Sequence, residues 1–245
     1  MLYAVLVKKQ TSWAHILALQ TVILRYGLPY AYYVDSHSIF RFVQTRDSLW
    51  RRHHLLTDET TPQWKQVLQD CNVKVIHSLS PQARGKIERP YGWLQDRVVR
   101  TCVREDVTDI HQAQRVLNQE LRRYNHHQIH STTQEIPYLR LQRALQENRS
   151  LFRAFTIRLP FQSAKDIFCL RAKRTIDPYR RVSLHNLHLK VNHATPRKEV
   201  TLRIYPLNHH ISEIRFWCEG KLIPEVPLWG DVQRVKNSDL KGVHF

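Results

Sequence analysis

Asp35 and Glu88 are the residues of this sequence whose type and setting best suit metal chemistry. Asp35 closes the apolar run AYYV, and Glu88 lies near the start of a pattern with helical spacing. The cations Arg84, Lys86 and Arg89 surround Glu88. Carboxylate oxygens are the ligands that Mg²⁺ prefers, and neighbouring cations suit a phosphate group. A carboxylate among cations in this setting could hold a metal ion near a phosphate.

Each carboxylate also has an ordinary structural interpretation. Asp35 with Ser36 is good turn chemistry after a strand, and a glutamate in a first helical turn is favoured by the helix dipole. Asp58 and Glu59 are rival carboxylates, but their Thr-rich segment is better suited to capping the helix expected next. The chemical interpretation therefore depends on the pattern around Asp35 and Glu88.

The elements expected to position Asp35 form a strand, a helix and a second strand. Residues 2–7 are an apolar run of strand length, and residues 30–34 are another. Between them, Thr11 or Ser12 can cap a helix that ends at Gly27. Such a βαβ unit makes a parallel pair, which places Asp35 at the carboxyl end of a strand, where open α/β sheets hold their sites. Residues 73–76 are expected in the same sheet.

The positions that follow have helical spacing. One apolar face contains Ile87, Tyr91, Leu94, Val98 and Cys102. This face predicts a helix from about residue 84 that is kinked or irregular over residues 86–90, because Pro90 removes a helical hydrogen bond. Further helices are predicted at residues 109–125 and 137–145.

The strings YYVDSHSIFR, SPQARGKIER and YNHHQIHSTTQEIP resemble the integrase core of DDE-type transposases and retroviral integrases. The resemblance extends over about residues 2–145 and is closest to transposases of bacterial insertion sequences. It implies an α/β fold of the RNase H-like type, with Asp35 and Glu88 as catalytic ligands of two Mg²⁺ or Mn²⁺ ions. The 52 residues between them exceed the gap in simple members of the family, and Pro90 is a second departure.

The family that this chain resembles uses a third carboxylate, an Asp on the first strand of its sheet. Residues 1–34 contain no Asp and no Glu, and only one predicted strand precedes the crossover helix. We therefore expect an N-terminally truncated core that is inactive alone and has an upstream chain segment as a partner. Two alternatives remain: a non-catalytic basic nucleic-acid-binding protein derived from a transposase, and a basic structural protein associated with RNA or DNA.

The charge of the chain predicts a polyanionic partner. There are 38 Lys and Arg against 21 Asp and Glu, a formal net charge of +17. DNA, as transposon ends and target duplex, is the partner that the resemblance implies, together with a homo-oligomer. The DNA backbone would be bound by Arg84, Lys86 and Arg89. A second group of cations, Arg46, Arg51 and Arg52, is interleaved with aromatic residues and would also bind it. An ordinary solvated loop explains that second group about as well.

The sequence gives no sign of a membrane, secreted, disulfide-rich or zinc-binding protein. No long apolar segment or signal peptide is evident, and the four cysteines are too scattered for a disulfide framework or zinc site. We expect a cytoplasmic, nucleoid-associated protein without a membrane partner.

The residue pattern and the resemblance together predict four regions along the chain. These are a partial RNase H-like core (1–147), a linker (148–165), a small all-β SH3-like barrel (166–228) and a tail (229–245). The barrel follows from short β-prone runs at regular spacing, separated by turns. Its last hairpin is suggested by FWCEGKLIPEVPL, which resembles the corresponding hairpin of the barrel that follows the core in many transposases.

Overall fold

A computed structural model describes residues 2–34, 63–77, 81–184, 187–192, 194–223 and 233–240 of the 245-residue chain. The chain divides into two compact units. The first takes residues 1–10, 21–36 and 75–155, and the second takes residues 11–20, 37–74 and 156–245. Within the described ranges, no helix combines the length and the apolar character needed to cross a membrane.

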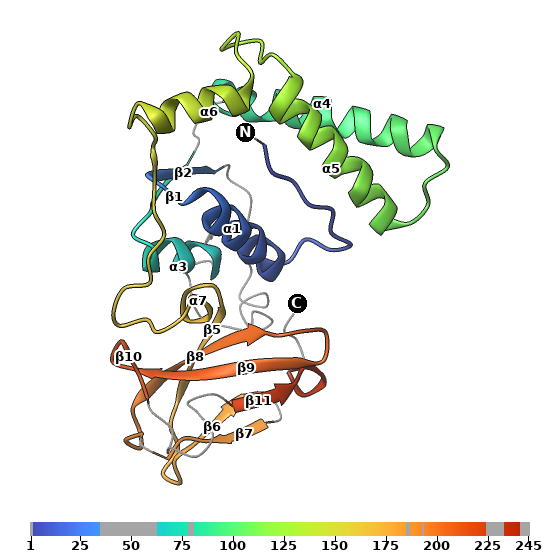
Figure 1. The fold of residues 1–245 in the computed structure, drawn as a ribbon. Coiled ribbons are helices and arrows are strands. Elements are labelled where there is room, and N and C mark those ends of the chain that lie inside the picture. The colour runs from blue at the N-terminus through green and yellow to red at the C-terminus, as the bar shows by residue number, and fades with distance from the viewer. Residues whose placement is uncertain are drawn as a thin grey trace. The chain divides into compact units, whose positions relative to one another are not determined.

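Most helices precede most strands along the chain (Figure 1). The described helices are α1 (Ser12–Tyr26), α3 (Gln63–Asp70), α4 (Pro81–Arg104), α5 (Ile110–His127), α6 (Pro137–Gln146) and α7 (Ala164–Ile167), with a 3-10 turn at Asn237–Asp239. The described strands are β1 (Leu28–Pro29), β2 (Ala31–Val34), β3 (Lys74–His77), β4 (Phe152–Arg153), β5 (Leu170–Thr175), β6 (Arg181–Leu184), β7 (Leu187–Lys190), β8 (Glu199–Pro206), β9 (Ile211–Cys218), β10 (Lys221–Leu222) and β11 (Gln233–Lys236).

Helix α1 begins and ends where its residues predict. The Thr11 hydroxyl accepts a hydrogen bond from the Ala14 backbone N–H at 3.1 Å, which satisfies one free donor of the first turn. After Tyr26, Gly27 adopts a φ of +93°, and its N–H donates to the carbonyl of Ile23 at 2.8 Å. Glycine adopts this left-handed conformation without strain, so it ends the helix cleanly.

We expect Gly27→Ala to destabilise the protein by more than the ~1–2 kcal/mol that a left-handed backbone costs an alanine. The added Cβ would also collide with the carbonyl oxygen of Arg153, on the strand paired with β1. Gly220→Ala is the matched control, because Gly220 has a φ of +75° and open space around its Cβ. Chemical denaturation of both variants would measure the difference. Equal losses would show that the collision relaxes at no cost.

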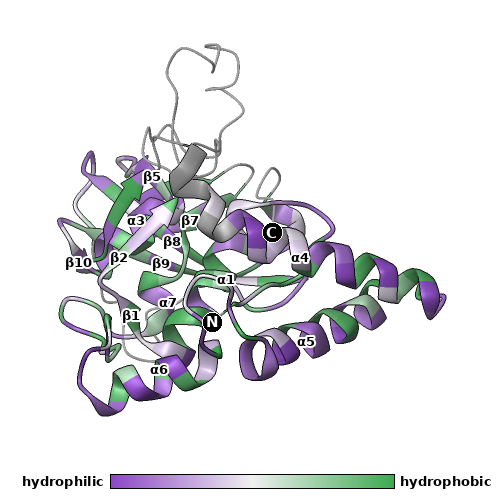
Figure 2. Cartoon of the chain, turned by 90° about the horizontal axis from the view of Figure 1, so that it is seen from above, coloured by the Kyte–Doolittle hydropathy of each residue, from purple (hydrophilic) through white to green (hydrophobic). Residues whose placement is uncertain are grey.

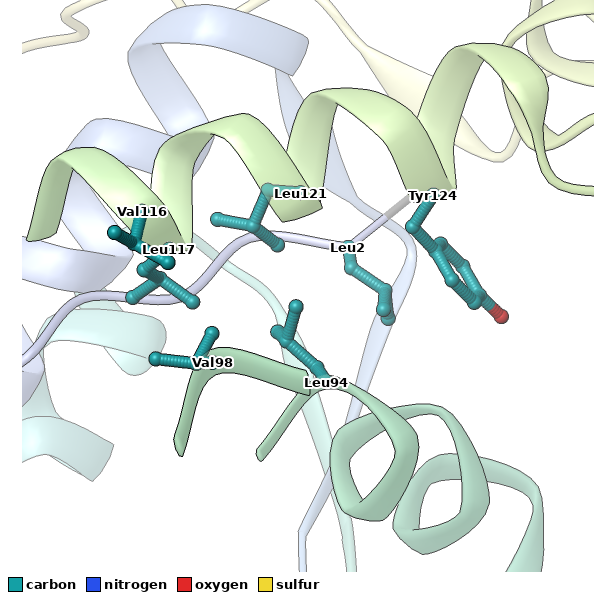
Figure 3. Packing of buried hydrophobic residues seen from close by; sticks show 7 residues of the cluster. All are labelled: Leu2, Leu94, Val98, Val116, Leu117, Leu121 and Tyr124. Atoms are coloured by element: carbon teal, nitrogen blue, oxygen red, sulfur yellow. The ribbon is translucent and has the colours of Figure 1, made fainter. Parts of the chain in front are cut away.

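Helices α4 and α5 pack along each other and form the core of the first unit (Figure 3). Leu94, Val98 and Cys102, from the predicted apolar face of α4, lie at this interface. The Asp109 carboxylate caps α5 by accepting from the backbone N–H groups of His111 and Gln112. Hydrophilic residues alternate with hydrophobic ones along both helices, as amphipathic helices require (Figure 2). The buried cluster consists of Leu2, Leu94, Val98, Val116, Leu117, Leu121 and Tyr124.

The predicted strand at residues 2–7 is wrong. This segment is extended, but it has no strand partner among the described residues. Side chains supply the missing hydrogen bonds: the Asn125 amide accepts from Leu2 N–H at 2.7 Å and donates to the Leu2 carbonyl at 2.9 Å, and Gln114 accepts from Leu6 N–H. Leu2, Ala4 and Leu6 turn toward the α4–α5 cluster. This apolar run therefore packs on helices and not in a sheet.

Two other predicted strands are confirmed, and the predicted irregularity of α4 is not. Strands β2 and β3 form a two-stranded sheet. Helix α4 starts at Pro81 and is helical through Pro90, whose side chain is buried. One helical hydrogen bond is lost at Pro90, but the packing of Leu94 and Val98 against α5 supports the helix beyond it.

The described strands of the second unit do not close into the predicted barrel. They form an open antiparallel sheet in the order β10-β9-β8-β5, with β11 also paired to β9, and a separate β6-β7 hairpin. The turn at Glu219 and Gly220 joins β9 to β10, as expected. Strand β11 and the buried Leu240 lie within residues 229–245, which were predicted to be a tail. Strand β4 lies within the predicted linker, residues 148–165, and α7 begins at its end.

Candidate functional site

Glu88 lies in the N-terminal half of α4 with its side chain exposed. Its carboxylate makes no hydrogen bond or ion pair to another residue that the structure describes. Arg89 beside it is also exposed, while Pro90 is buried. An exposed carboxylate can ligate a cation, and Glu88 lies six residues before Leu94, where α4 packs on α5.

The other predicted site residues are placed only in part. Arg84 and Lys86 are in the first turns of α4, on the same stretch of helix as Glu88 and Arg89. Asp35 follows β2 directly, and β3, the partner of β2, leads into α4. Asp35 itself and the predicted DNA-binding residues Arg46, Arg51 and Arg52 lie outside the described residues. The separation of the Asp35 and Glu88 carboxylates therefore stays a prediction.

The fit of the site to a metal ion rests on its donor chemistry. Carboxylate oxygen suits Mg²⁺ or Mn²⁺, and Glu88 supplies one such group with no competing partner among the described residues. Across the ranges that the structure describes, no three His, Cys, Asp or Glu side chains come together as metal ligands. Of the two predicted ligands, Glu88 lies in the described part of the chain, and Asp35 would have to contribute the second.

A pocket beside Arg89 was not predicted from the sequence. It has a volume of about 680 Å³ and lies between α4 and the turn that follows α5. We call it the Trp93 pocket. Its lining is Gly85, Arg89, Pro90 and Trp93 of α4, Tyr124 of α5, and residues 128–133. One signal was present: Gly85, Arg89 and Trp93 are spaced at i, i+4 and i+8, so they share a helix face.

Glu135 anchors the turn that forms one wall of this pocket. Its carboxylate accepts hydrogen bonds from Arg140 and Arg143 of α6. These bonds, that from Arg143 first, hold the pKa of Glu135 below its ordinary value. His130 and Glu135 also form an isolated β-bridge across the turn. The segment YNHHQIHSTTQEIP therefore has two parts in the structure. Its central residues, 128–133, line the pocket, and its Glu135 holds the turn in place through the two arginines of α6.

The sequence comparisons give one relative. Over 119 residues, or 49% of this chain, the protein is 27% identical to a Sinorhizobium fredii protein named "Putative transposase y4bF". The match spans 24% of that relative's length. No family model matches the chain. About half of the chain is thus similar to about a quarter of a protein named as a putative transposase, and any activity of that whole relative is a proposal for this chain.

The structure comparison gives a weaker likeness. One chain of the cryo-EM structure of the simian T-cell lymphotropic virus intasome in complex with PP2A regulatory subunit B56 gamma is 13% identical, with a TM-score of 0.40. The structural match covers 91% of this chain and 67% of the intasome chain. A TM-score this low does not establish a shared fold. The RNase H-like fold accordingly stays a prediction, while the described units are of mixed α and β structure.

Proposed function

We propose that the chain is a DNA transposition or integration protein whose Asp35 and Glu88 ligate Mg²⁺ or Mn²⁺ for phosphoryl transfer. The observation that carries this proposal is Glu88: an exposed carboxylate, unpaired among the described residues, on a helix whose first turns contain three cations. The similarity of about half the chain to a transposase supports the same class. Transposon ends and a target duplex would be the substrates, with a homo-oligomer or an upstream chain segment completing the assembly.

The bound metal ions would neutralise charge on the reacting phosphate and activate the attacking oxygen. The chain's own residues would do the positioning. Helix α4, held on α5 by its buried face, would present Glu88 to the metal from a rigid backbone. Arg84, Lys86 and Arg89 would bind phosphate oxygens, which fixes the register of DNA without reading its sequence.

A second candidate is a non-catalytic DNA-binding protein derived from a transposase. The observation that favours it is the absence of Asp and Glu from residues 1–34, where the resembled family has its first carboxylate. This candidate keeps the phosphate contacts of α4 and gives up the chemistry. DNA binding is therefore common to both candidates and is the first property to test.

We expect the affinity of the chain for duplex DNA to fall as the salt concentration rises. This dependence on salt should become weaker when Arg84, Lys86 and Arg89 are changed together to Gln. Each phosphate contact contributes about −0.9 to the slope of log K against log salt, so three lost contacts should reduce the slope by about 2.7. Fluorescence anisotropy at a series of salt concentrations measures this slope.

The matched control changes Arg100, Arg104 and Arg149 to Gln. These three cations are exposed, and each already pairs with a neighbouring carboxylate, of Asp96, Glu105 and Glu147 respectively. The control removes the same charge but should alter the slope less, because those cations are partly neutralised before DNA arrives. Equal changes of slope in the two triple variants would show that the α4 cations contribute only net charge and no specific phosphate contacts. No binding at low salt would contradict both candidate functions.

A further inference from the structure

The Trp93 pocket has the size of a ligand site and chemistry of two kinds. Its volume of about 680 Å³ lies within the range of roughly 300–1,000 Å³ that small-molecule sites occupy. One wall is aromatic and the other is a polar turn with Arg89 nearby. A ligand that fits this lining must combine a flat apolar part with a negatively charged or strongly polar part.

The aromatic wall is held rigidly. The ring centres of Trp93 and Tyr124 lie 5.3 Å apart at an interplanar angle of 54°, and the Arg97 guanidinium lies 5.0 Å from the centre of the Trp93 ring. Tyr124 stands at the end of the buried cluster with its hydroxyl turned away from the aliphatic side chains (Figure 3). The half-buried Trp93 ring can give a base a surface for stacking at little entropic cost, and the buried Tyr124 ring supports it.

The polar wall presents hydrogen-bond donors. Nδ1 of His130 accepts from the Thr132 backbone N–H at 3.2 Å, so the neutral imidazole carries its proton on Nε2 and can donate from there. Ser131 and Thr132 are exposed and add two hydroxyls. Arg89, also exposed, supplies the positive charge. Donors and a cation beside an aromatic surface match a phosphate next to a base.

We propose that the Trp93 pocket binds one unpaired nucleotide of a DNA strand, with its base against Trp93 and its phosphate at Arg89. A base still paired in a duplex has both its faces stacked and its edge covered, so it cannot enter; an unstacked one can. This inference rests on the proposed DNA binding and adds to it a preference for duplexes that carry an unpaired nucleotide.

Gly85 allows a direct test because a Cβ can be added there without a collision with the described residues. A Cβ at Gly85 meets no atom within 4 Å, and the same is true at Gly92, seven residues further along α4. Gly85 lines the pocket and Gly92 does not. Gly85→Leu should therefore fill the pocket, and Gly92→Leu is the matched control on the same helix. Gly85→Ala is a milder second variant that rules out an effect of leucine on folding.

The measurement is fluorescence anisotropy of the full chain with two labelled duplexes, one fully paired and one with a single unpaired nucleotide. Wild type and Gly92→Leu should bind the duplex with the unpaired nucleotide with a Kd about tenfold lower than that for the paired duplex. This difference corresponds to ~1.4 kcal/mol of binding free energy. Gly85→Leu should lose this preference, Gly85→Ala should lose part of it, and all should bind the paired duplex equally.

Several outcomes would overturn the inference. Binding of both duplexes with equal affinity by wild type, or an unchanged preference in Gly85→Leu, would contradict it while leaving the proposed function standing. No binding of either duplex would contradict the proposed function as well. Gly85-dependent binding of free dAMP without a preference for the unpaired duplex would assign the pocket to a free nucleotide instead of a strand.

Discussion

Asp70→Ala should lower the free energy of unfolding of the second unit by about 3–5 kcal/mol, the cost of removing one partner from a buried ion pair. A single oxygen of Asp70 accepts from Arg171 and from Arg203, each at 2.7 Å. The Arg171 side chain is only 4% exposed and that of Arg203 is 11% exposed. Without Asp70, both guanidinium groups would lose their carboxylate partner while remaining largely out of water.

The same contacts explain why α3 depends on this ion pair. Gln63, its first residue, exchanges two hydrogen bonds with the backbone of Arg171, at 2.7 and 2.8 Å. Asp70, its last residue, holds the Arg171 side chain, and between them Trp64, Val67 and Leu68 are buried. Helix α3 is thus fastened to β5 at both ends, so a loss at Asp70 should loosen the helix and expose its apolar face.

Urea denaturation followed by tryptophan fluorescence would measure the loss at Asp70. Asp96→Ala is the control, because the Asp96–Arg100 ion pair has side chains that are 55% and 79% exposed. Exposed pairs of this kind contribute about 0.3–0.5 kcal/mol. A loss at Asp70 no larger than that at Asp96 would mean that water or another group replaces the carboxylate.

Local patterns predicted the helices well because a helix closes its own hydrogen bonds. The cap at Thr11, the left-handed Gly27 and the apolar spacing of Leu94 and Val98 can each be recognised within a few residues of sequence. Residues 2–7 show the limit of this approach. An apolar extended run needs partners for its backbone, and here distant side chains, chiefly that of Asn125, supply them.

The candidate site was predictable only for residues that act from one element. Glu88 and Arg89 follow from the start of α4, and both are exposed as a binding role requires. The Trp93 pocket was not predictable, because it exists only where the turn after α5 packs beside α4. The ion pairs of Asp70 likewise join residues more than 100 positions apart in sequence.

The isolated chain should show no Mg²⁺- or Mn²⁺-dependent cutting or joining of DNA. Two carboxylates, Asp35 and Glu88, stand where the resembled family uses three, and residues 1–34 contain no Asp or Glu to replace the third. A two-metal site that lacks a ligand binds its ions weakly and positions the phosphate poorly. Positioning and charge stabilisation supply almost all of the catalysis in phosphoryl transfer, so the expected rate is at background.

Plasmid nicking and oligonucleotide strand transfer by the purified chain would test this expectation, with Glu88→Gln as the control. Duplex binding, measured first, must be equal in the two proteins, so that inactivity is not mistaken for misfolding. We expect wild type and Glu88→Gln to give the same background, because Gln keeps the shape of the side chain and removes only the charge that a metal needs. Robust wild-type activity that disappears in Glu88→Gln would instead show that a third ligand comes from elsewhere in these 245 residues. Asp58 and Glu59, the rival carboxylates between Asp35 and Glu88, would then be the first residues to replace.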